Sequence, residues 1–240
     1  MSRVIRKNIL MKKISSIIIL LFIYTSLQGQ NSASGFFSGL NLSMLTGDST
    51  KLPNRTFRYG ARAGMFWDFN VKYNTDFEFG IFYSQQGVKY YHQYFDFNKE
   101  VYMKNINKID YIQIPVVWKE HFGTAYTKIG IYSEIAANAK SLWFLEYKYR
   151  DSMQTYNGQY PSFVNSLRLY DIGAYFGAGF QFSTRKKVDI LIEANFTHGF
   201  FPINEGEYSS ENQMRNMSFN ISAGLLFGKS KKKKYKSHRR

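Results

Sequence analysis

The sequence of 240 residues predicts an all-β fold, an eight-stranded antiparallel up-and-down transmembrane β-barrel with short periplasmic turns and long extracellular loops. Three observations predict this fold class. Apolar residues fall on every second position over eight separate stretches, which is the period of a β-strand. The connections between these stretches are alternately short and long, as in bacterial membrane barrels. The N-terminal segment has the features of a secretory signal peptide, which predicts export.

Residues 1–29 are predicted to be a cleaved signal peptide. A basic pair, Lys12 and Lys13, precedes a short apolar run at 17–24, and a small residue, Gly29, stands at a suitable cleavage point. The apolar run is shorter than the roughly 20 residues that a membrane-spanning helix needs, so an uncleaved anchor is the less favoured alternative. Met11 is a second possible start, because it opens a more typical basic region than Met1 does.

The first four expected strands show apolar residues alternating with polar residues or glycine. They comprise residues 36–44, 58–69, 77–86 and 111–119. The second strand is the clearest of them, because Tyr59, Met65 and Trp67 occupy one face and Arg62 the other. Pro115 in the fourth strand lacks an N–H group for a paired ladder, so we expect a β-bulge there.

The last four expected strands contain the most regular alternation in the chain. They comprise residues 128–137, 170–182, 188–197 and 217–227. Residues 170–182 and 188–197 flank a short polar break, and each run is close to the roughly 9–11 residues of a tilted membrane-crossing strand. These two runs therefore predict a hairpin with one apolar face and one face of polar residues and glycine.

The connections are expected to differ in length at the two rims of the barrel. The short ones are 71–75, 121–124 and 183–186, and the long ones are 46–56, 90–108, 140–167 and 201–215. The barrel domain is thus predicted to comprise residues 30–228, with no internal repeat and no coiled coil.

The net charge of +15 is concentrated at the two ends of the chain. Five basic residues precede position 29 and eight lie within 229–240, which leaves 19 basic against 17 acidic residues between them. Nucleic-acid binding is therefore not predicted. Residues 229–240 are expected to form a basic, solvated periplasmic tail, or alternatively to contact an acidic partner or anionic lipid. The absence of cysteine excludes a disulfide framework.

Alternation alone does not distinguish a membrane barrel from a soluble, lipocalin-like barrel whose apolar face points inward. Glycines recur on the polar faces (Gly60 and Gly64, and again Gly173, Gly177 and Gly179), which suits a narrow interior. Aromatic residues gather on the apolar faces near the short turns, as in an interfacial girdle: Trp67, Phe69, Phe77, Trp118, Phe182 and Phe227. With the asymmetry of the loops, these observations favour apolar faces that contact lipid.

Several short motifs resemble the PorT-like outer-membrane β-barrel family of porin-like proteins. They are Gly39-Leu40-Asn41-Leu42-Ser43, Gly60-Ala61-Arg62-Ala63-Gly64, Tyr83-Ser84-Gln85-Gln86-Gly87, Tyr111-Ile112-Gln113-Ile114-Pro115 and Gly177-Ala178-Gly179-Phe180. The resemblance covers residues 35–228. It implies a location in the outer membrane of the cell envelope of a Gram-negative bacterium, and the founding PorT type is linked to type IX protein secretion. An accessory role in that secretion is therefore one expectation.

The inward faces of the predicted barrel carry charges of both signs. An eight-stranded barrel is narrow enough for side chains to fill it, and unpaired buried charges are costly. We therefore expect an ion-pair network of Arg58, Arg62, Glu78, Lys119, Lys128, Glu134, Asp171 and Glu193, with Asp68 and Asp189 also pointing inward. In this network Arg62 is expected to bridge two acids chosen from Glu78, Glu134, Asp171 and Glu193. A small gated pore for ions or small solutes is the alternative.

The loop at 140–167 is dense in aromatic residues, among them Trp143, Phe144, Tyr147, Tyr149 and Tyr156. These five are a candidate interaction surface for a partner or a glycan. They equally fit strands that continue above the membrane, where the rings would pack against one another.

No catalytic constellation is evident. His198 stands at the loop end of the seventh strand without an obvious Ser or Asp partner, and no pair of histidines has the spacing of metal ligands. We predict no enzyme activity, no cofactor and no metal site. The predicted function is a non-enzymatic membrane scaffold or interaction barrel, whose partners are outer-membrane lipid and other envelope or secretion proteins.

Overall fold

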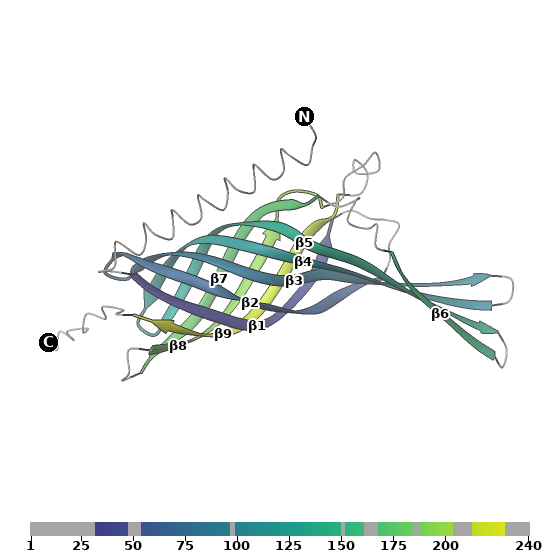
Figure 1. Cartoon of the computed structure of the whole chain (residues 1–240), viewed down its shortest axis with the longest axis horizontal. Coiled ribbons are helices and arrows are strands. Elements are labelled where there is room, and N and C mark those ends of the chain that lie inside the picture. The colour runs from purple at the N-terminus through teal and green to yellow at the C-terminus, as the bar shows by residue number, and fades with distance from the viewer. Residues whose placement is uncertain are drawn as a thin grey trace, which may run out of the picture.

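The computed structural model describes residues 32–47, 54–96, 99–149, 152–160, 168–184, 188–203 and 213–228. All regular structure in these residues is β-strand (Figure 1). No helix within these ranges is long and apolar enough to cross a membrane. The predicted signal peptide and the predicted basic tail both lie outside the described residues.

Nine strands are present in the described part of the chain. They are β1 (Ser32–Thr46), β2 (Asn54–Lys72), β3 (Thr75–Asp96), β4 (Lys99–Phe122), β5 (Ala125–Tyr149), β6 (Ser152–Tyr160), β7 (Tyr170–Ser183), β8 (Val188–Gly199) and β9 (Arg215–Phe227).

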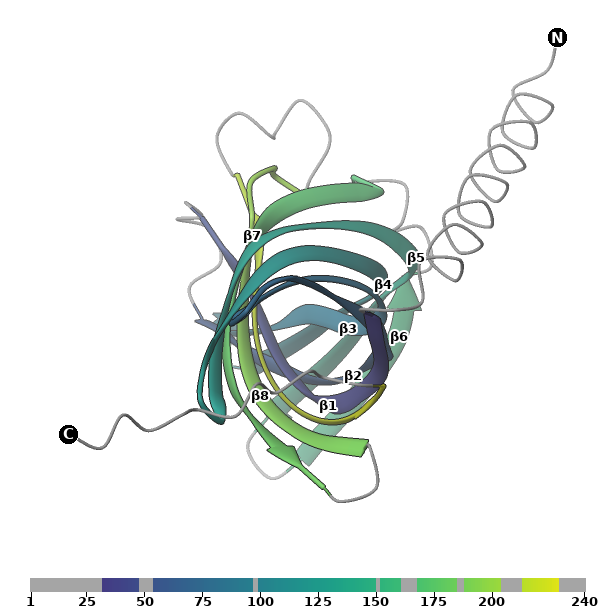
Figure 2. The ribbon, with the colours of Figure 1, turned by 90° about the vertical axis from the view of Figure 1, so that its left-hand side faces the viewer.

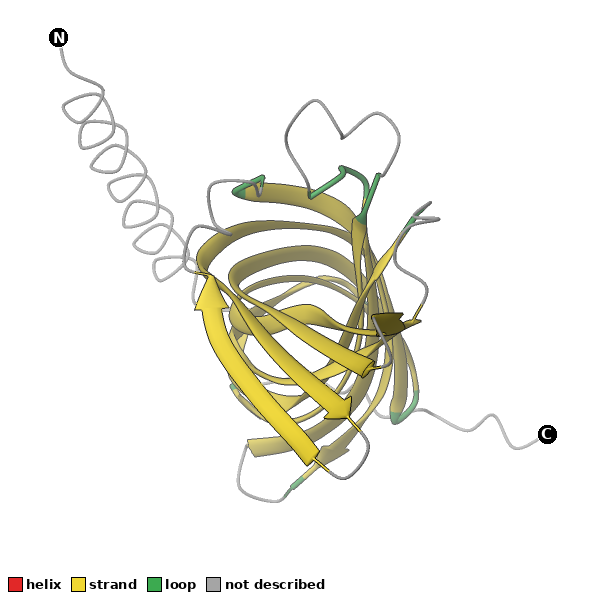
Figure 3. Ribbon diagram, turned by 90° about the vertical axis from the view of Figure 1, so that its right-hand side faces the viewer, coloured by secondary structure: helices red, strands yellow, loops and turns green. Residues whose placement is uncertain are grey.

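Eight of these strands close into a ring (Figures 2 and 3). Strand β1 pairs with β2 on one side and with β9 on the other. Residues 125–135 of β5 pair with both β4 and β7, which closes the ring. Every pairing is antiparallel. The predicted eight-stranded barrel is therefore confirmed. The ninth strand, β6, was not predicted. Among the described strands it pairs only with β5, at residues 141–149.

The ring confirms the short turns at one rim. Strands β2 and β3 are joined at Tyr73 and Asn74, and β4 and β5 are joined at Gly123 and Thr124. Gly123 has a φ of 71°, a conformation that glycine adopts without steric cost and that tight hairpins require. Strand β1 begins, and β9 ends, at this same rim, because Ser34 pairs with both Trp67 and Phe227.

The inner face of the ring is polar and charged and the outer face is apolar, as a membrane-spanning barrel requires. All ten charged side chains expected to point inward are buried: Arg58, Arg62, Asp68, Glu78, Lys119, Lys128, Glu134, Asp171, Asp189 and Glu193. The opposite face leaves large apolar side chains exposed on every strand of the ring, for example Leu40, Met65, Ile129, Ile192 and Ile221. Since burying apolar surface in lipid is favourable, the apolar band is the surface that the bilayer covers.

Glycines make room for large rings inside the barrel. Tyr126 lies over Gly179, its partner across the β5–β7 ladder, so that a Cβ there would come within 2.6 Å of the ring. Tyr132 lies in the same way over Gly173, where a Cβ would be 2.5 Å from the ring. The interior is therefore as cramped as the series of glycines indicates.

The expected bulge at Pro115 is wrong. Strand β4 keeps one register with β3 from Phe79–Val116 to Phe82–Gln113, and only the ladder between these pairs is interrupted. Proline removes a hydrogen-bond donor without inserting a residue, so the ladder loses a bond and does not shift. The register shift on this strand lies instead between Asp110 and Tyr111, in the ladder with β5.

Two of the expected long loops are largely strands. Residues 90–108 form the ends of β3 and β4, and most of residues 140–167 form the end of β5 and all of β6. Together these four strand ends make a sheet that projects beyond the barrel on the side opposite the short turns (Figure 1). We call this extension, residues 91–96, 99–104, 143–149 and 152–158, the projecting sheet.

Candidate functional site

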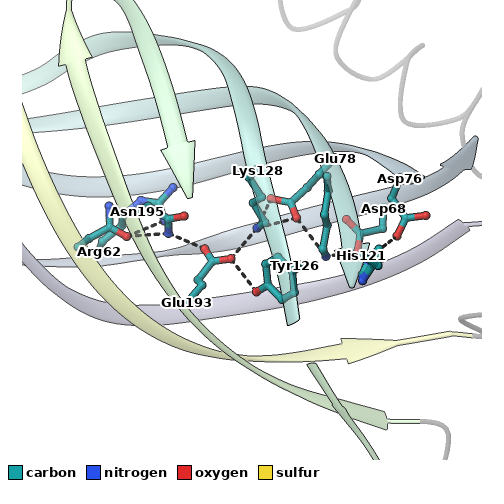
Figure 4. A network of polar contacts seen from close by, with 11 residues as sticks. Arg62, Asp68, Asp76, Glu78, His121, Tyr126, Lys128, Glu193 and Asn195 are labelled. Carbon is teal, nitrogen blue, oxygen red and sulfur yellow. Dashed lines mark hydrogen bonds and ion pairs between the residues drawn. The ribbon is translucent and has the colours of Figure 1, made fainter. Parts of the chain in front are cut away.

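A cluster of ion pairs fills the middle of the barrel (Figure 4). Lys119 of β4 lies 2.8 Å from Asp68 of β2 and 3.5 Å from Glu78 of β3. Lys128 of β5 lies 2.8 Å from the same Glu78 and 2.5 Å from Glu193 of β8. The two lysines thus join three carboxylates from three strands across the lumen.

Aromatic rings enclose these lysines. The Nζ atom of Lys119 is 4.6 Å from the ring centroid of Tyr126, and that of Lys128 is 5.1 Å from the ring centroid of Phe37. The Tyr126 hydroxyl also donates a hydrogen bond of 3.0 Å to Glu193. Cation–π contacts and charge-assisted hydrogen bonds both strengthen where water is excluded, so the rings stabilise the buried charges.

The expected bridge from Arg62 to two acids is not formed. No carboxylate of the described chain lies within ion-pair distance of Arg62, whose guanidinium carbon lies instead 3.8 Å above the ring centroid of Phe82. One of its nitrogens reaches Asn220 at 3.5 Å, and Asn195 donates hydrogen bonds to both Asn220 (3.0 Å) and Glu193 (2.6 Å). Two amide side chains therefore stand between the arginine and the nearest acid of the cluster.

With Arg62 included, the connected cluster holds three cations and three anions. Two of the acids expected to pair with Arg62, Glu78 and Glu193, pair with Lys128 instead. A cluster of zero net charge avoids most of the cost of a buried uncompensated charge.

Three other residues of the expected network lie elsewhere in the interior. Arg58 donates to the backbone carbonyl of Gln86. Glu134 accepts hydrogen bonds from three amides, namely those of Gln86 (2.8 Å), Gln113 (3.2 Å) and Asn216 (3.1 Å). Asp171 accepts from the backbone N–H of Ile172 at 2.8 Å. No ion pair to these three residues forms among the described residues.

Two apolar clusters also occupy the interior. The first surrounds the charged cluster and comprises Ala33, Phe37, Phe66, Phe82, Tyr126, Leu191 and Leu226. The second lies toward the rim opposite the short turns and comprises Leu45, Val88, Tyr90, Ile109, Tyr111, Ala139 and Ile203. Such packing leaves little space for solute, which agrees with the narrow interior of an eight-stranded barrel.

The candidate loop surface lies on the projecting sheet. Trp143, Phe144, Tyr147 and Tyr149 belong to β5 and Tyr156 to β6, although the side chain of Tyr149 is outside the described residues. Tyr147 and Tyr156 meet edge to face at 5.8 Å between ring centroids. Strand continuation, one of the two alternatives for this segment, is therefore what the structure contains.

Trp143 and Phe144 point to opposite faces of the sheet, as successive strand residues do. The indole of Trp143 lies against Gly158, where a Cβ would be 2.3 Å from the ring. Phe144 instead receives the Lys104 ammonium at 5.8 Å from its ring centroid. Phe144 therefore lies on the opposite face from Trp143, Tyr147 and Tyr156.

His198 approaches Thr46 at 3.4 Å and has no carboxylate partner within the described residues. Across those same residues, no group of three or more His, Asp or Glu side chains is arranged to hold a metal ion. A second histidine that the sequence did not single out, His121, lies 2.8 Å from Asp76 at the short-turn rim.

Sequence reasoning also missed the asparagines that line the lumen. Asn41, Asn195 and Asn220 come from β1, β8 and β9 and are all buried. The alternating pattern places these asparagines on the inward face, but the predicted network included only charged residues. In the structure Asn195 and Asn220 connect Arg62 to the charged cluster, and Asn41 donates to the hydroxyl of Ser84 and the backbone carbonyl of Gln85.

A closed antiparallel ring with a polar, filled interior and an apolar outer band is the architecture of a transmembrane β-barrel. The chain belongs to the outer membrane protein beta-barrel domain family, which matches residues 28–205. It is thus an outer-membrane β-barrel protein of a Gram-negative bacterium, which is the location that the resemblance implied. A comparison with curated proteins gives no match.

Solved outer-membrane proteins are similar to this chain at low sequence identity. Ail, the attachment invasion locus protein of Yersinia pestis, is 10% identical over 82% of this chain and 100% of its own, with a TM-score of 0.36. Neisserial surface protein A is 12% identical over 82% and 96%, with a TM-score of 0.36. The outer membrane protein AlkL is 10% identical over 84% and 92%, with a TM-score of 0.38.

Proposed function

We propose that this protein is a non-enzymatic scaffold and interaction barrel, exported through a cleaved signal peptide, that presents its projecting sheet outside the membrane. The observation that carries the proposal is the contrast between the two ends of the molecule. The interior is occupied by apolar clusters and a balanced ion-pair cluster. Four strands, by contrast, continue past the rim and expose aromatic side chains, among them Tyr94, Phe95 and Tyr156.

A barrel plugged by salt bridges serves as a rigid support, and binding residues are often carried by segments that such a support positions. The charged cluster is accordingly proposed to stabilise the barrel and not to transport protons or solutes. Strand ends held in a four-stranded sheet also lose less conformational entropy on binding than free loops do, which favours recognition.

Removal of the projecting sheet tests this proposal. Residues 93–102 and 146–155 would each be replaced by a two-residue hairpin turn, leaving the ring intact. We expect the shortened protein to reach the outer membrane and to keep a heat-modifiable gel band, while cross-links from the intact protein to other envelope components disappear. An unchanged cross-linking pattern would contradict the proposal.

The finer family assignment is also a proposal. The motifs that resemble the PorT-like type support an accessory role in type IX secretion, in which the projecting sheet would contact other secretion proteins. Deletion of the gene should then reduce the release of proteins that leave by this route, and restoring only the shortened barrel should not rescue it.

A small gated pore is the second candidate, and one observation favours it. Several buried polar atoms along the lumen have no hydrogen-bond partner in the described chain, including Nε and Nη2 of Arg62 and Oδ1 of Asn41. Buried polar groups of this kind commonly bind water. Discrete conductance steps in planar bilayers, altered by replacing Arg62, would favour the pore over the scaffold.

A further inference from the structure

The two faces of the projecting sheet differ sharply in charge. The first face continues the lumen side of the barrel. Tyr90 belongs to the second apolar cluster inside the barrel, and His92 and Tyr94, two and four positions further along β3, point to the same side of the strand. Its rows across the four strands are Tyr94–Val101–Tyr147–Gln154, His92–Met103–Leu145–Tyr156 and Tyr90–Asn105–Trp143–Gly158. Apart from His92, none of these twelve residues is titratable near neutral pH. We call this surface the aromatic face.

The opposite face carries the charges. Its rows are Phe95–Glu100–Lys148–Met153, Gln93–Tyr102–Glu146–Thr155 and Tyr91–Lys104–Phe144–Asn157. Glu100 stands directly across from Lys148, and Tyr102 donates a hydrogen bond to Glu100 at 3.0 Å. Such cross-strand pairs are typical of a solvated face. A sheet in water on both sides has no need to keep three successive rows of one face free of acidic and basic side chains, so these rows suit a ligand that is itself uncharged.

The aromatic face is held in place by its own contacts. Tyr94 and Tyr147 flank Val101, which is completely buried although it lies above the rim. Tyr147 packs edge to face on Tyr156, and the indole of Trp143 rests on Gly158. Tyr94 and Tyr156 nevertheless remain 39% and 50% exposed. These rings are rigid, partly open platforms.

We infer that the aromatic face binds a neutral glycan. Tyrosine and tryptophan rings offer flat apolar surfaces to the C–H faces of sugar rings, and their polar tips offer hydrogen bonds. The amides of Asn105 and Gln154 stand in the same rows and can both donate to and accept from sugar hydroxyls. This combination of rigid aromatic rings with short amides is also how antibody surfaces bind polar ligands.

The charge pattern decides among ligand classes. An anionic polysaccharide or a phosphate group would require unpaired lysine or arginine. In the three rows the lysines, Lys104 and Lys148, stand on the opposite face, and Lys99, in the next row of the aromatic face, stands directly across from Asp96. The oxygens of both amides already accept hydrogen bonds, Asn105 from Ser141 (2.9 Å) and Gln154 from Tyr156 (3.2 Å), so a hydrocarbon ligand would leave only their N–H groups without partners in the described chain, which costs free energy. A neutral polysaccharide satisfies both the rings and the amides. The inference rests on the proposed function, since the projecting sheet must be presented outside the membrane.

Affinity electrophoresis of the full chain in detergent would test the inference. Native gels would contain dextran, mannan or galactan as neutral probes and alginate as the anionic probe. We expect retardation by at least one neutral polysaccharide. Tyr94→Ala and Tyr156→Ala should each weaken it roughly tenfold, because each removes one stacking platform. The matched control is Tyr91→Ala, which removes a tyrosine of the same strand and the same 39% exposure from the opposite face, and should leave retardation unchanged.

Retardation by alginate alone, or by no neutral polysaccharide, would overturn the inference. An equal effect of Tyr91→Ala and Tyr94→Ala would also overturn it. A gel band that stays heat-modifiable in every variant separates these outcomes from a failure to fold. Labelling of the projecting sheet on intact cells checks the proposed function independently, so the two can fail separately.

Discussion

At the scale of single residues, the interior depends on two lysines that are almost completely removed from solvent. Lys119 and Lys128 share Glu78 as a common partner, and each holds one further acid. A buried ion pair gains little over well-packed apolar side chains, but breaking one leaves an uncompensated charge. The sensitivity of the barrel to substitution should therefore follow the number of direct ion pairs that each cation makes.

Replacement of Lys128 by Met should be strongly destabilising. The substitution conserves the length of the side chain but leaves Glu78 with one cation and Glu193 with none among the ion pairs that the structure describes. We expect a loss of about 3–5 kcal/mol in the free energy of unfolding. Urea titration in detergent, followed by the loss of the folded gel band, would measure it. Lys140→Met, at an exposed position of the same strand, should change the stability by less than about 0.5 kcal/mol.

Replacement of Arg62 by Ala should cost less than the loss of Lys128. Arg62 makes one hydrogen bond, to Asn220, and one close cation–π contact, with Phe82, but no direct ion pair with a described acid. We expect about 1–2 kcal/mol in the same titration. If Arg62→Ala proved as damaging as Lys128→Met, a direct bridge to an acid, as the sequence suggested, would have to form in the membrane.

The residues of the interior could be predicted from the sequence, but their partners could not. Strand parity places all ten charged side chains inside, because successive residues alternate between faces. Which residues meet depends on the tilt and stagger of strands around the ring, and a single sequence does not reveal these. The prediction that Arg62 bridges two acids failed for this reason. Strand parity determines whether a side chain faces the lumen or the lipid, but it does not determine the position of that side chain along the barrel axis.

At the scale of elements, β3, β4 and β5 extend further than their alternation predicts, and β6 has no counterpart among the predicted strands. Within the membrane one face of each strand is apolar and the other polar, so the period of two is evident. Beyond the rim both faces carry aromatic residues, as at Tyr91 and Tyr94, and the contrast between faces is lost. Because no clear alternation is present, the sequence predicts loops here, although the residues themselves favour strands.

Accessibility to a label distinguishes the two ends of these elements. The chain has no cysteine, so one cysteine introduced at a chosen site is the only reactive thiol. Phe95→Cys places it on the projecting sheet, at a residue 75% exposed, and Tyr73→Cys places it in a short turn, at a residue 51% exposed. A membrane-impermeant maleimide should label Phe95→Cys on intact cells and Tyr73→Cys only after lysis. The reverse result would mean the opposite orientation in the membrane.

At the scale of the whole molecule, polarity is inverted relative to a soluble barrel. The charges lie inside, and the outer surface is an apolar band with aromatic residues near the short turns, including Trp118 and Phe227, which are 43% and 42% exposed. The sequence predicted this inversion because glycines recur on the polar faces, as at Gly60 and Gly64 beside Arg62, a combination that a narrow lumen accommodates and an apolar core does not.

The most direct test of this inverted barrel with a projecting sheet is the quenching of tryptophan fluorescence by lipids brominated near the headgroup. The chain has only three tryptophans, at 67, 118 and 143, so variants with a single tryptophan at 118 or at 143 isolate the two regions. In reconstituted bilayers the account predicts strong quenching at Trp118, on the lipid-facing band, and little at Trp143, above the rim. Unquenched fluorescence at Trp118 would show that the apolar face does not contact lipid, and it would contradict the account.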